Sequence, residues 1–407
     1  MVHHTINTNS SRAASASSKI TVMQQVSRVL GAAVLVGLLA ACAGRPPPTT
    51  PAATELALPP AAPVADSAPL GPTIERARSR WVPVRWSELP GFEQDNTAEA
   101  WNAWIKSCER PGPSLARLCG EVRRLSLGSA AEQRDWMRQR LQPYRVEPTA
   151  GASAPGAEGL LTSYFEPLYD ASRLPRPGFG VPVHRPPPSL GQRKPWYTRQ
   201  EMDLLPEARA QLAGSELVWL ADPLDALILQ IQGSGRVRVS EADGSQRLVR
   251  LAFAATNDQP YRSPGKWLME QGLLRGDATW PGIRAALAAS PQHLQSFLWS
   301  NPRTVFFREE PLSALDAQFG PRGAQGVALT PGRSIAVDPQ SIPYGTPVWL
   351  ASSGPVASLQ RLVLAQDTGS AIVGAVRADY FAGWGPEAGD FAGRMKQPLR
   401  LWVLWPR

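Results

Sequence analysis

The sequence predicts a mainly β protein with flanking helices, in which short strands close into a barrel. From residue 159 onward, apolar runs of strand length alternate with turns that contain Gly or Pro, a pattern typical of small β-barrels. Between residues 81 and 144 the apolar residues instead recur with the spacing of helices. The 407 residues are enough for two domains with separate cores.

The chain begins with features of an export signal. Arg28 precedes an apolar run over residues 29–39, and two alanines and Cys42 follow this run. A positive flank, a short apolar segment and small residues before the cut define such signals, and the run is too short to span a bilayer. The sequence LAAC ending at Cys42 also resembles the bacterial lipobox, whose cysteine is acylated. A plain signal peptide is the alternative for residues 1–42, and Met23 is an alternative start.

Residues 43–75 are rich in Pro and Ala and are predicted to form an unpacked tether. In a polyproline-like state, about thirty residues would reach roughly 90 Å at about 3.1 Å each. Residues 76–150 are predicted to be a helical N-terminal region, in which one helix begins after Ser129 and ends before Pro143.

Cys108 and Cys119 lie eleven positions apart between helical patterns. In an exported protein this pair indicates a disulfide between two helices. A reactive thiol would need a partner base, but after the signal the sequence holds just His184 and His293. Two distant histidines also argue against a zinc site and against a Ser/His/Asp triad. The sequence therefore predicts neither a metal nor a cofactor.

Two β regions follow, at residues 151–300 and 301–407. In the first, strands are expected at 160–167, 217–223, 226–240 and 245–254, with a hairpin turn at 243–244, and helices at 264–273, 281–288 and 291–300. In the second, strands are expected at 305–309, 333–338, 346–351, 359–367 and 399–406. The glycine-rich residues 233–235 lack the remaining residues of a phosphate loop, so we interpret them as a tight loop after a strand.

Three aspartates in the C-terminal region are the candidate reactive groups. Asp338 and Asp367 each follow an apolar run and precede turn residues, which places them at strand ends that lead into loops. Such aspartates are often plain turn formers, and this alternative holds for each acid. Asp379 stands between an alanine and two aromatic residues, where nothing resembles a turn. Because an apolar environment raises the pKa of a carboxyl group, Asp379 is predicted to act as a general acid.

The formal net charge of +8 is carried almost wholly by dispersed arginines. No basic run resembles a nucleic-acid-binding arm, so nucleic acid is not a predicted partner. A modest positive surface suits an anionic polymer, but a general bias toward arginine explains the composition equally well.

Several segments in a fixed order give the sequence a family resemblance. They are LTSYFEP (161–167), ILQIQGSGRVRV (228–239), YRSPGKWL (261–268), NPRTVFFRE (301–309) and the closing AVDPQSIPYGTP, LAQDTGSAI and GWGPEAGDFAGRM. The closing segments resemble the three-aspartate (3D) domain. From about Tyr144 to its end, the chain resembles the MltA type of membrane-bound lytic murein transglycosylases. The departures, Pro264 and the run Thr368-Gly369-Ser370, leave the three acids in place.

The resemblance implies a double-psi β-barrel catalytic domain, a second β domain inserted in the middle, and a groove between them. The 3D domain, residues 301–407, would complete the barrel. The resemblance also implies that Asp379 is the single catalytic acid. Asp367 would then raise the pKa of Asp379 or orient it, and Asp338 would hold the loop geometry.

The implied activity is cleavage of the β-1,4 bond between N-acetylmuramic acid and N-acetylglucosamine without water, which leaves 1,6-anhydromuramoyl ends. Tyr164, Phe165, Gln232, Gly233 and Ser234 are then candidates for glycan binding. Core packing is the alternative for the two aromatic residues, and a simple turn is the alternative for the others.

Two other hypotheses stay open, a hydrolytic muramidase on the same site and a non-catalytic wall-binding lipoprotein. Glu166 is the next candidate acid after Asp367. Because Ala43 rather than Asp follows Cys42, the resemblance implies a lipid anchor in the outer membrane that faces the periplasm. The implied partners are peptidoglycan strands and, further, complexes of cell-wall synthesis or division.

Overall fold

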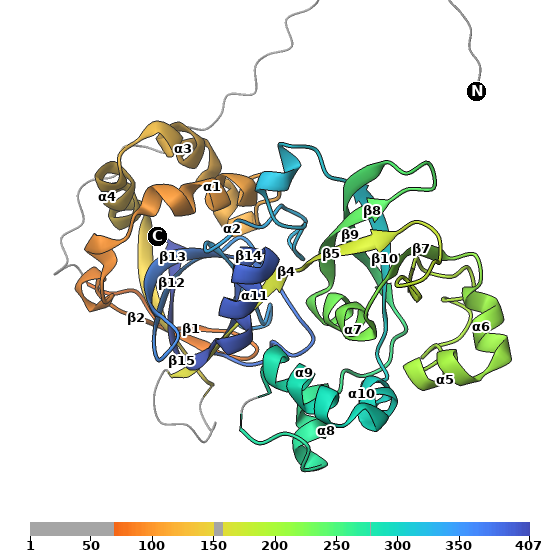
Figure 1. The fold of residues 1–407 in the computed structure, drawn as a ribbon. Coiled ribbons are helices and arrows are strands. Elements are labelled where there is room, and N and C mark those ends of the chain that lie inside the picture. The colour runs from red at the N-terminus through yellow and green to blue at the C-terminus, as the bar shows by residue number, and fades with distance from the viewer. Residues whose placement is uncertain (1–68, 150–157, 277) are drawn as a thin grey trace, which may run out of the picture. The chain divides into compact units, whose positions relative to one another are not determined.

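Two β-sheets organise the chain (Figure 1). The computed structural model describes residues 69–149, 158–276 and 278–407, which all belong to one unit that extends from Ala57 to Arg407. Among these residues, nine strands form the first sheet and six form the second. The predicted signal, Cys42 and most of the predicted tether lie outside the described residues.

The first sheet closes into a barrel. Its strand order is β1-β2-β3-β15-β12-β13-β11-β14-β4, and β4 also pairs with β15. The strands of the ring are β4 (Gly159–Glu166), β11 (Ser334–Val337), β12 (Pro347–Ser353), β13 (Ser358–Asp367), β14 (Arg377–Trp384) and β15 (Lys396–Pro406). The pairs β11–β13 and β14–β4 are parallel, although most neighbours are antiparallel. The mainly β prediction is confirmed, and chain-distant strands complete the barrel as expected.

Alternating side chains fill the barrel. Leu161 of β4, Val348 of β12, and Ala378 and Tyr380 of β14 belong to one buried cluster. Successive side chains of a strand point to opposite faces, so a residue between two core residues faces outward. Asp379 lies between Ala378 and Tyr380 and therefore projects from the outer face of the barrel.

Helices of the N-terminal region cover one side of the barrel (Figure 1). A capping box between Ser129 and Glu132 begins α4, as predicted, and a disulfide joins Cys108 to Cys119. The helical elements are η1 (Trp86–Glu88), η2 (Phe92–Gln94), α1 (Thr97–Ser107), α2 (Pro113–Ala116), α3 (Cys119–Arg124), η3 (Leu125–Leu127) and α4 (Ala130–Arg140). The helical prediction is wrong at both ends of this region, where β2 (Arg80–Pro83) and β3 (Leu141–Glu147) extend the barrel sheet. The end of the predicted tether is also wrong, because β1 (Ile74–Glu75) pairs with β2.

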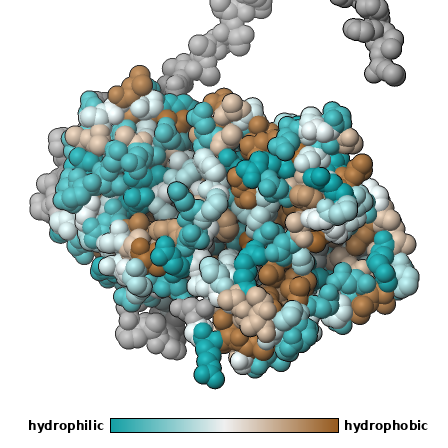
Figure 2. All heavy atoms as spheres, viewed as in Figure 1, coloured by the Kyte–Doolittle hydropathy of each residue, from teal (hydrophilic) through white to brown (hydrophobic). Residues whose placement is uncertain are grey.

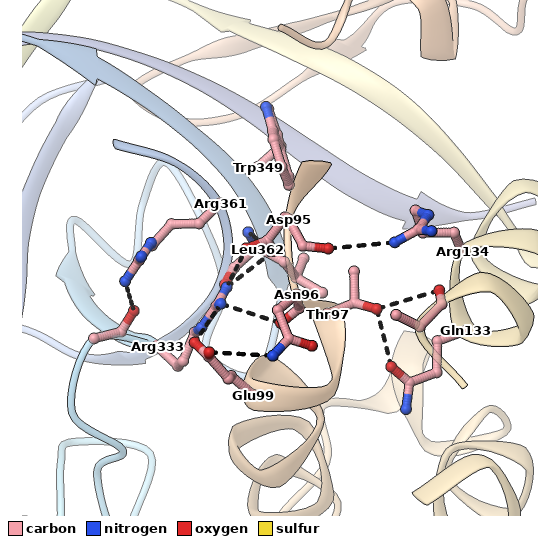
Figure 3. Close-up of polar contacts among 12 residues, drawn as sticks. Asp95, Asn96, Thr97, Glu99, Gln133, Arg134, Arg333, Trp349, Arg361 and Leu362 are labelled. Carbon is pink, nitrogen blue, oxygen red and sulfur yellow. Dashed lines mark hydrogen bonds and ion pairs between the residues drawn. The ribbon is translucent and has the colours of Figure 1, made fainter. Parts of the chain in front are cut away.

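A buried ion pair fastens this helical region to the barrel (Figure 3). Arg333, just before β11, donates from one guanidinium nitrogen to both carboxylate oxygens of Asp95, each at 2.9 Å. Its other terminal nitrogen donates to Glu99 of α1 at 2.7 Å. The backbone N–H of Leu362 in β13 also donates to Asp95 at 3.0 Å. Asp95 therefore ties the start of α1 to two segments of the barrel.

The second sheet has the order β10-β9-β8-β5-β7-β6. Its strands are β5 (Leu168–Ser172), β6 (Val181–His184), β7 (Glu216–Leu220), β8 (Ser234–Ser240), β9 (Gln246–Thr256) and β10 (Val305–Pro311). The predicted hairpin at 243–244 joins β8 to β9, with Ser240 opposite Gln246. Two short helices, α5 (Arg199–Leu204) and α6 (Pro206–Leu212), lie in the connection between β6 and β7.

The prediction of a strand at residues 226–232 is wrong. This segment belongs to a helix, α7 (Pro223–Gln232), whose first turn is capped by the Asp222 side chain with Pro223 at the first position. Gly233 ends the helix in the left-handed conformation, with φ of 80°. The run of apolar residues is continuous because α7 is buried between the sheet and other helices, so it carries no clear period of 3.6.

The three predicted helices after β9 are present as α8 (Pro264–Glu270), α9 (Trp280–Ala289) and η4 (Pro291–His293) with α10 (Leu294–Ser300). They share a small apolar core with α7 that contains Leu227, Leu268, Ile283 and Phe297. On the face drawn in Figure 2, hydrophilic residues dominate over the barrel side, and apolar patches gather mainly over the second sheet and these helices. No helix within the described residues is both long enough and apolar enough to cross a membrane.

A second buried ion cluster lies where the chain passes from the barrel to the second sheet. Glu166, the last residue of β4, is fully buried and accepts from Arg236 at 2.7 Å and from Arg250 at 2.5 Å. Both arginines also donate to the carbonyl of Phe319, in the segment that returns from β10 to the barrel. The Arg236 guanidinium lies 3.9 Å from the ring centre of Trp384, at the end of β14. This cluster fixes both chain crossings between the two sheets.

Candidate active site

A cavity of about 350 Å³ lies between the barrel and the second β domain. The barrel side contributes residues of β4, β14 and the loop that follows β13, and the other side contributes residues of α7, β9 and the segment leading into β10. Its polar and charged lining includes Thr162, Tyr164, Gln230, Gln232, Tyr261, Arg303, Arg377 and Asp379. The expected groove between two β domains is therefore present.

The parallel pair of β4 and β14 sets the position of Asp379. Asp379 lies opposite Thr162, and Phe381 lies opposite Tyr164. The Thr162 hydroxyl donates to Oδ1 of Asp379, and Nη2 of Arg377 donates to the same Thr162 oxygen at 2.8 Å. Asp379 is thus a strand residue that a neighbouring strand holds in place, and not a turn former.

Burial is the largest influence on Asp379 and raises the pKa of its carboxyl group. The hydrogen bond from Thr162 and the positive charge of Arg377 lower this pKa, whereas the negative charge of Asp367 raises it. The balance leaves the pKa above the ordinary value, as the apolar sequence around Asp379 predicts. Asp379 therefore keeps its proton to a higher pH than a free aspartate, which suits a general acid.

Asp367 ends β13 with both carboxylate oxygens engaged. The Tyr164 hydroxyl donates to Oδ2 at 2.8 Å, and the backbone N–H groups of Ala324 and Thr368 donate to Oδ1, each at 2.9 Å. Burial raises the pKa of Asp367, and these three hydrogen bonds oppose the rise. The tyrosine thus fixes this second acid from the strand that also holds Asp379.

Asp338 lies directly after β11 and is buried. It accepts from the backbone N–H of Gly374 at 2.9 Å and of Gln340 at 3.0 Å, and it forms an ion pair with Arg78 at 3.2 Å. The bond to Gly374 holds the loop between β13 and β14, whose residues 368–372 line the cavity. Asp338 is not among the cavity-lining residues, so its geometry fits support of the loop and not direct chemistry.

The predicted glycan-binding residues divide into two groups. Tyr164, Gln232 and Gly233 line the cavity, whereas Phe165 and Ser234 do not. The Phe165 ring packs on Gly389 of α11 (Gly385–Arg394), where an added Cβ would come within 2.9 Å of it. Ser234 is buried at the start of β8. The positions of these two residues favour the core-packing and turn alternatives, because Phe165 packs against α11 and Ser234 is buried.

Sequence reasoning missed several residues of the cavity. The period of two along a strand could have found Thr162, two positions before Tyr164, and Arg377, two positions before Asp379. Gln230 lies in α7, Tyr261 in the segment after β9 and Arg303 in the segment before β10. Each lies within one of the segments that carry the family resemblance, and this could have indicated them.

Other candidate groups do not share this cavity. Glu166 is fully buried between Arg236 and Arg250, so it is not available to a substrate. His184 lines a different cavity beside α5, where burial lowers the pKa of its imidazole. In the described ranges, no group of three His, Cys, Asp or Glu side chains is arranged to hold a metal ion.

One oxygen of Asp379 carries the Thr162 hydrogen bond, and no described residue donates to the other. A carboxyl group with a raised pKa and an oxygen available at a cleft can protonate a bound leaving group and later accept a proton. Fold and site thus define a protein of the carboxylate acid–base class, the chemistry that glycan-cleaving enzymes use.

Comparisons with known proteins identify similar sequences and structures. The model of the MltA specific insert domain matches residues 160–308, and that of the 3D domain matches residues 333–405. The structure of the lytic transglycosylase LtgG of Burkholderia pseudomallei is 41% identical, with 86% of this chain and 100% of that chain covered and a TM-score of 0.56. That of MltA from Neisseria gonorrhoeae is 26% identical, with 85% and 98% covered and a TM-score of 0.68.

A curated relative, the membrane-bound lytic murein transglycosylase A of Vibrio cholerae, is 31% identical over 254 residues, which cover 60% of this chain. The chain spans 65% of the length of that relative. With these matches, the chain belongs to the MltA family of lytic transglycosylases.

Proposed function

We propose that this protein is a peptidoglycan lytic transglycosylase. It cleaves the β-1,4 bond between N-acetylmuramic acid and N-acetylglucosamine without water and leaves 1,6-anhydromuramoyl ends. The observation that carries the proposal is the contrast between Asp379, which lines the cavity, and Asp367, which does not. Asp379 lines the cavity with an oxygen to which no described residue donates, whereas Asp367 accepts hydrogen bonds on both oxygens.

In this mechanism Asp379 serves twice. Its protonated carboxyl group donates a proton to the glycosidic oxygen, which leaves with N-acetylglucosamine. The resulting carboxylate then removes the proton from the C6 hydroxyl of the same muramoyl residue, and that oxygen bonds to C1 to close the anhydro ring. One acid suffices because the attacking oxygen already belongs to the bound substrate, which gives it a high effective concentration.

The arrangement disfavours the hydrolytic alternative. Hydrolysing glycosidases use a second free carboxylate as a nucleophile or to activate water. Asp367 is the carboxylate whose charge acts on Asp379. Its three hydrogen bonds engage both of its oxygens and leave it poorly suited to act as a nucleophile or to activate water. Its role in the proposal is to raise the pKa of Asp379, and the role of Asp338 is to hold the loop that carries Thr368.

Mass spectrometry of products from purified glycan strands tests this function. Muropeptides lighter than the hydrolysed form by the mass of one water are expected, and products of full hydrolysed mass would contradict the proposal. Asp379→Asn keeps the shape but loses both proton transfers, each worth about 10² to 10⁴ in rate. His184→Ala and His293→Ala are the matched controls, expected to keep their activity.

We also propose a lipid anchor at Cys42, which holds the enzyme in the outer membrane on its periplasmic side. The curated relatives carry the name membrane-bound, and the LAAC sequence supports the same location. Through the tether, the enzyme would reach peptidoglycan strands and the complexes of wall synthesis or division. Cys42→Ala is expected to release an active soluble form in cell fractionation, and its retention on membranes would contradict the anchor.

A further inference from the structure

Arg377 shares the outward face of β14 with Asp379 and lines the same cavity. Its Nη1 donates to the backbone carbonyls of Ala378 at 2.5 Å and Leu160 at 3.4 Å, which hold the guanidinium across the seam between β14 and β4. Its Nη2 donates to Oγ1 of Thr162 at 2.8 Å. The arginine is therefore anchored by two strands at the point where Thr162 meets Asp379.

The chemistry of these groups fixes the direction of each hydrogen bond. A guanidinium can only donate, whereas a threonine hydroxyl has one proton and can also accept. Because Nη2 of Arg377 points a proton at one of the two acceptor sites of Thr162 Oγ1, the hydroxyl proton is directed away from the guanidinium and toward Asp379. Without the arginine, the same hydroxyl is free to rotate and to accept a hydrogen bond from a neutral Asp379 instead.

We propose that Arg377 is a positioning residue that holds the Thr162 hydroxyl as a permanent donor to Asp379. The inference rests on the proposed function, in which Asp379 transfers the proton. A hydrogen bond donated to a carboxylate favours its charged form, whereas burial disfavours that form. The arginine thus limits the rise in the pKa of Asp379 that burial causes. Asp379 can then release its proton in the first step and regain one in the second.

The charges around Asp379 come from three sides. Arg377 lies on the same strand, and Asp367 lies at the end of β13 with Tyr164 of β4 hydrogen-bonded to it. Lys396 of β15 stands opposite Thr162 in the β15–β4 register and is exposed. Arg377 differs from Asp367, which acts on Asp379 by its charge, because Arg377 acts both by its charge and through the threonine hydroxyl.

The test is a pH titration of the aspartate carboxyl carbons by NMR in the full chain, with the Asp379 signal assigned by its loss in Asp379→Asn. Arg377→Met is expected to raise the pKa of Asp379 by about 1 or more, and Thr162→Val is expected to raise it in the same direction. Arg377→Lys keeps a donor and a charge, so it is expected to restore most of the wild-type value.

The double variant Arg377→Met/Thr162→Val separates positioning from plain charge. If the arginine acts through Thr162, Arg377→Met shifts the pKa of Asp379 less in the Thr162→Val background than in the wild-type background. Fully additive changes would overturn the positioning role, and so would an unchanged pKa in Arg377→Met. If Arg377→Met does not fold, Arg377→Gln replaces it, because Gln can donate or accept and so removes the fixed direction.

This titration measures the pKa of Asp379 without substrate, so its outcome does not depend on whether the proposed reaction is correct. Activity retained by Asp379→Asn would defeat the proposed function and leave the titration result standing. Where Asp379 is the acid, Arg377→Met also moves the high-pH limb of kcat/KM to higher pH, by the same amount as the measured pKa. A merely structural arginine would lower activity without moving that limb.

Discussion

Tyr164 and Asp367 belong to barrel strands that are not neighbours, yet the tyrosine hydroxyl donates to the aspartate at 2.8 Å. Two positions earlier on the same face of β4, Thr162 donates to Asp379. One strand therefore holds both acids, and its alternation of side chains sets their separation. This arrangement makes the protonation of each acid sensitive to changes in β4.

Asp367→Asn is expected to lower the pKa of Asp379, because it removes a nearby negative charge that raises it. The high-pH limb of kcat/KM should then move to lower pH, with a smaller loss of activity than Asp379→Asn causes. Tyr164→Phe, which keeps the ring packing against Phe381, should raise the pKa of Asp367 by removing one donor. An unchanged pH profile in Asp367→Asn would show that the two acids are not coupled.

Asp379→Asn is expected to stabilise the folded protein at neutral pH. Burial raises the folded-state pKa of Asp379, so the native state binds more protons than the unfolded state between the two pKa values. Wild-type stability therefore falls as pH rises through this window and stays reduced above it. In Asp379→Asn, the amide oxygen still accepts the hydrogen bond from Thr162. The amide does not ionise, so the variant avoids the cost of a buried negative charge.

Urea unfolding of both proteins, from below the pKa of a free aspartate up to neutral pH, measures this difference. The two free energies of unfolding should be similar at the acidic end and diverge as pH rises. A variant less stable than the wild type at neutral pH would mean that Asp379 is well paired as a carboxylate.

The disulfide between Cys108 and Cys119 leads to another prediction. Both cysteines should resist thiol labelling until the protein is reduced. Cys108→Ser/Cys119→Ser should lower the free energy of unfolding by about 2–4 kcal/mol, because the bridge restricts the unfolded chain. Since the bridge lies in the N-terminal helical region, kcat should stay near the wild-type value. Rapid labelling of the unreduced protein would contradict the bridge.

The sequence was most informative where local chemistry decides the structure. Strand ends at Asp338 and Asp367, the cap at Ser129 and the hairpin at 243–244 each depend on a few adjacent residues, and the structure contains all of them. The α7 segment was mistaken for a strand because a buried helix and a buried strand can share one continuous apolar run.

Elements around Asp379 were harder to predict. β14 was missed as a strand because it ends in a Gly-rich stretch, and α11 was missed because its sequence GPEAGDFAGR contains three glycines, which are weak helix formers. Tertiary contacts with β4 stabilise both elements, and no single segment records such contacts. For the same reason, residue spacing alone could not predict that Arg377 is connected to Asp379 through Thr162.

The buried cluster around Glu166 gives the last prediction. Glu166 neutralises Arg236 and Arg250, whose side chains are 5% and 7% exposed, while its own side chain is 0% exposed. Glu166→Gln keeps the size but leaves two buried cations without a counter-charge, which is expected to lower the free energy of unfolding by about 3–5 kcal/mol. The matched control is Asp170→Asn, which breaks an exposed pair with Arg238 and should cost about 0–1 kcal/mol.

Kinetics on the folded fraction separate this structural role from a catalytic one. If Glu166 only joins the two sheets, Glu166→Gln measured below its unfolding temperature should keep its pH profile, since Thr162 and Asp379 stay in place. Loss of the whole activity in a variant that is folded by circular dichroism would instead move the proton-transfer role to Glu166. Equal stability of Glu166→Gln and Asp170→Asn would show that the cluster is hydrated and does not fix the chain crossings.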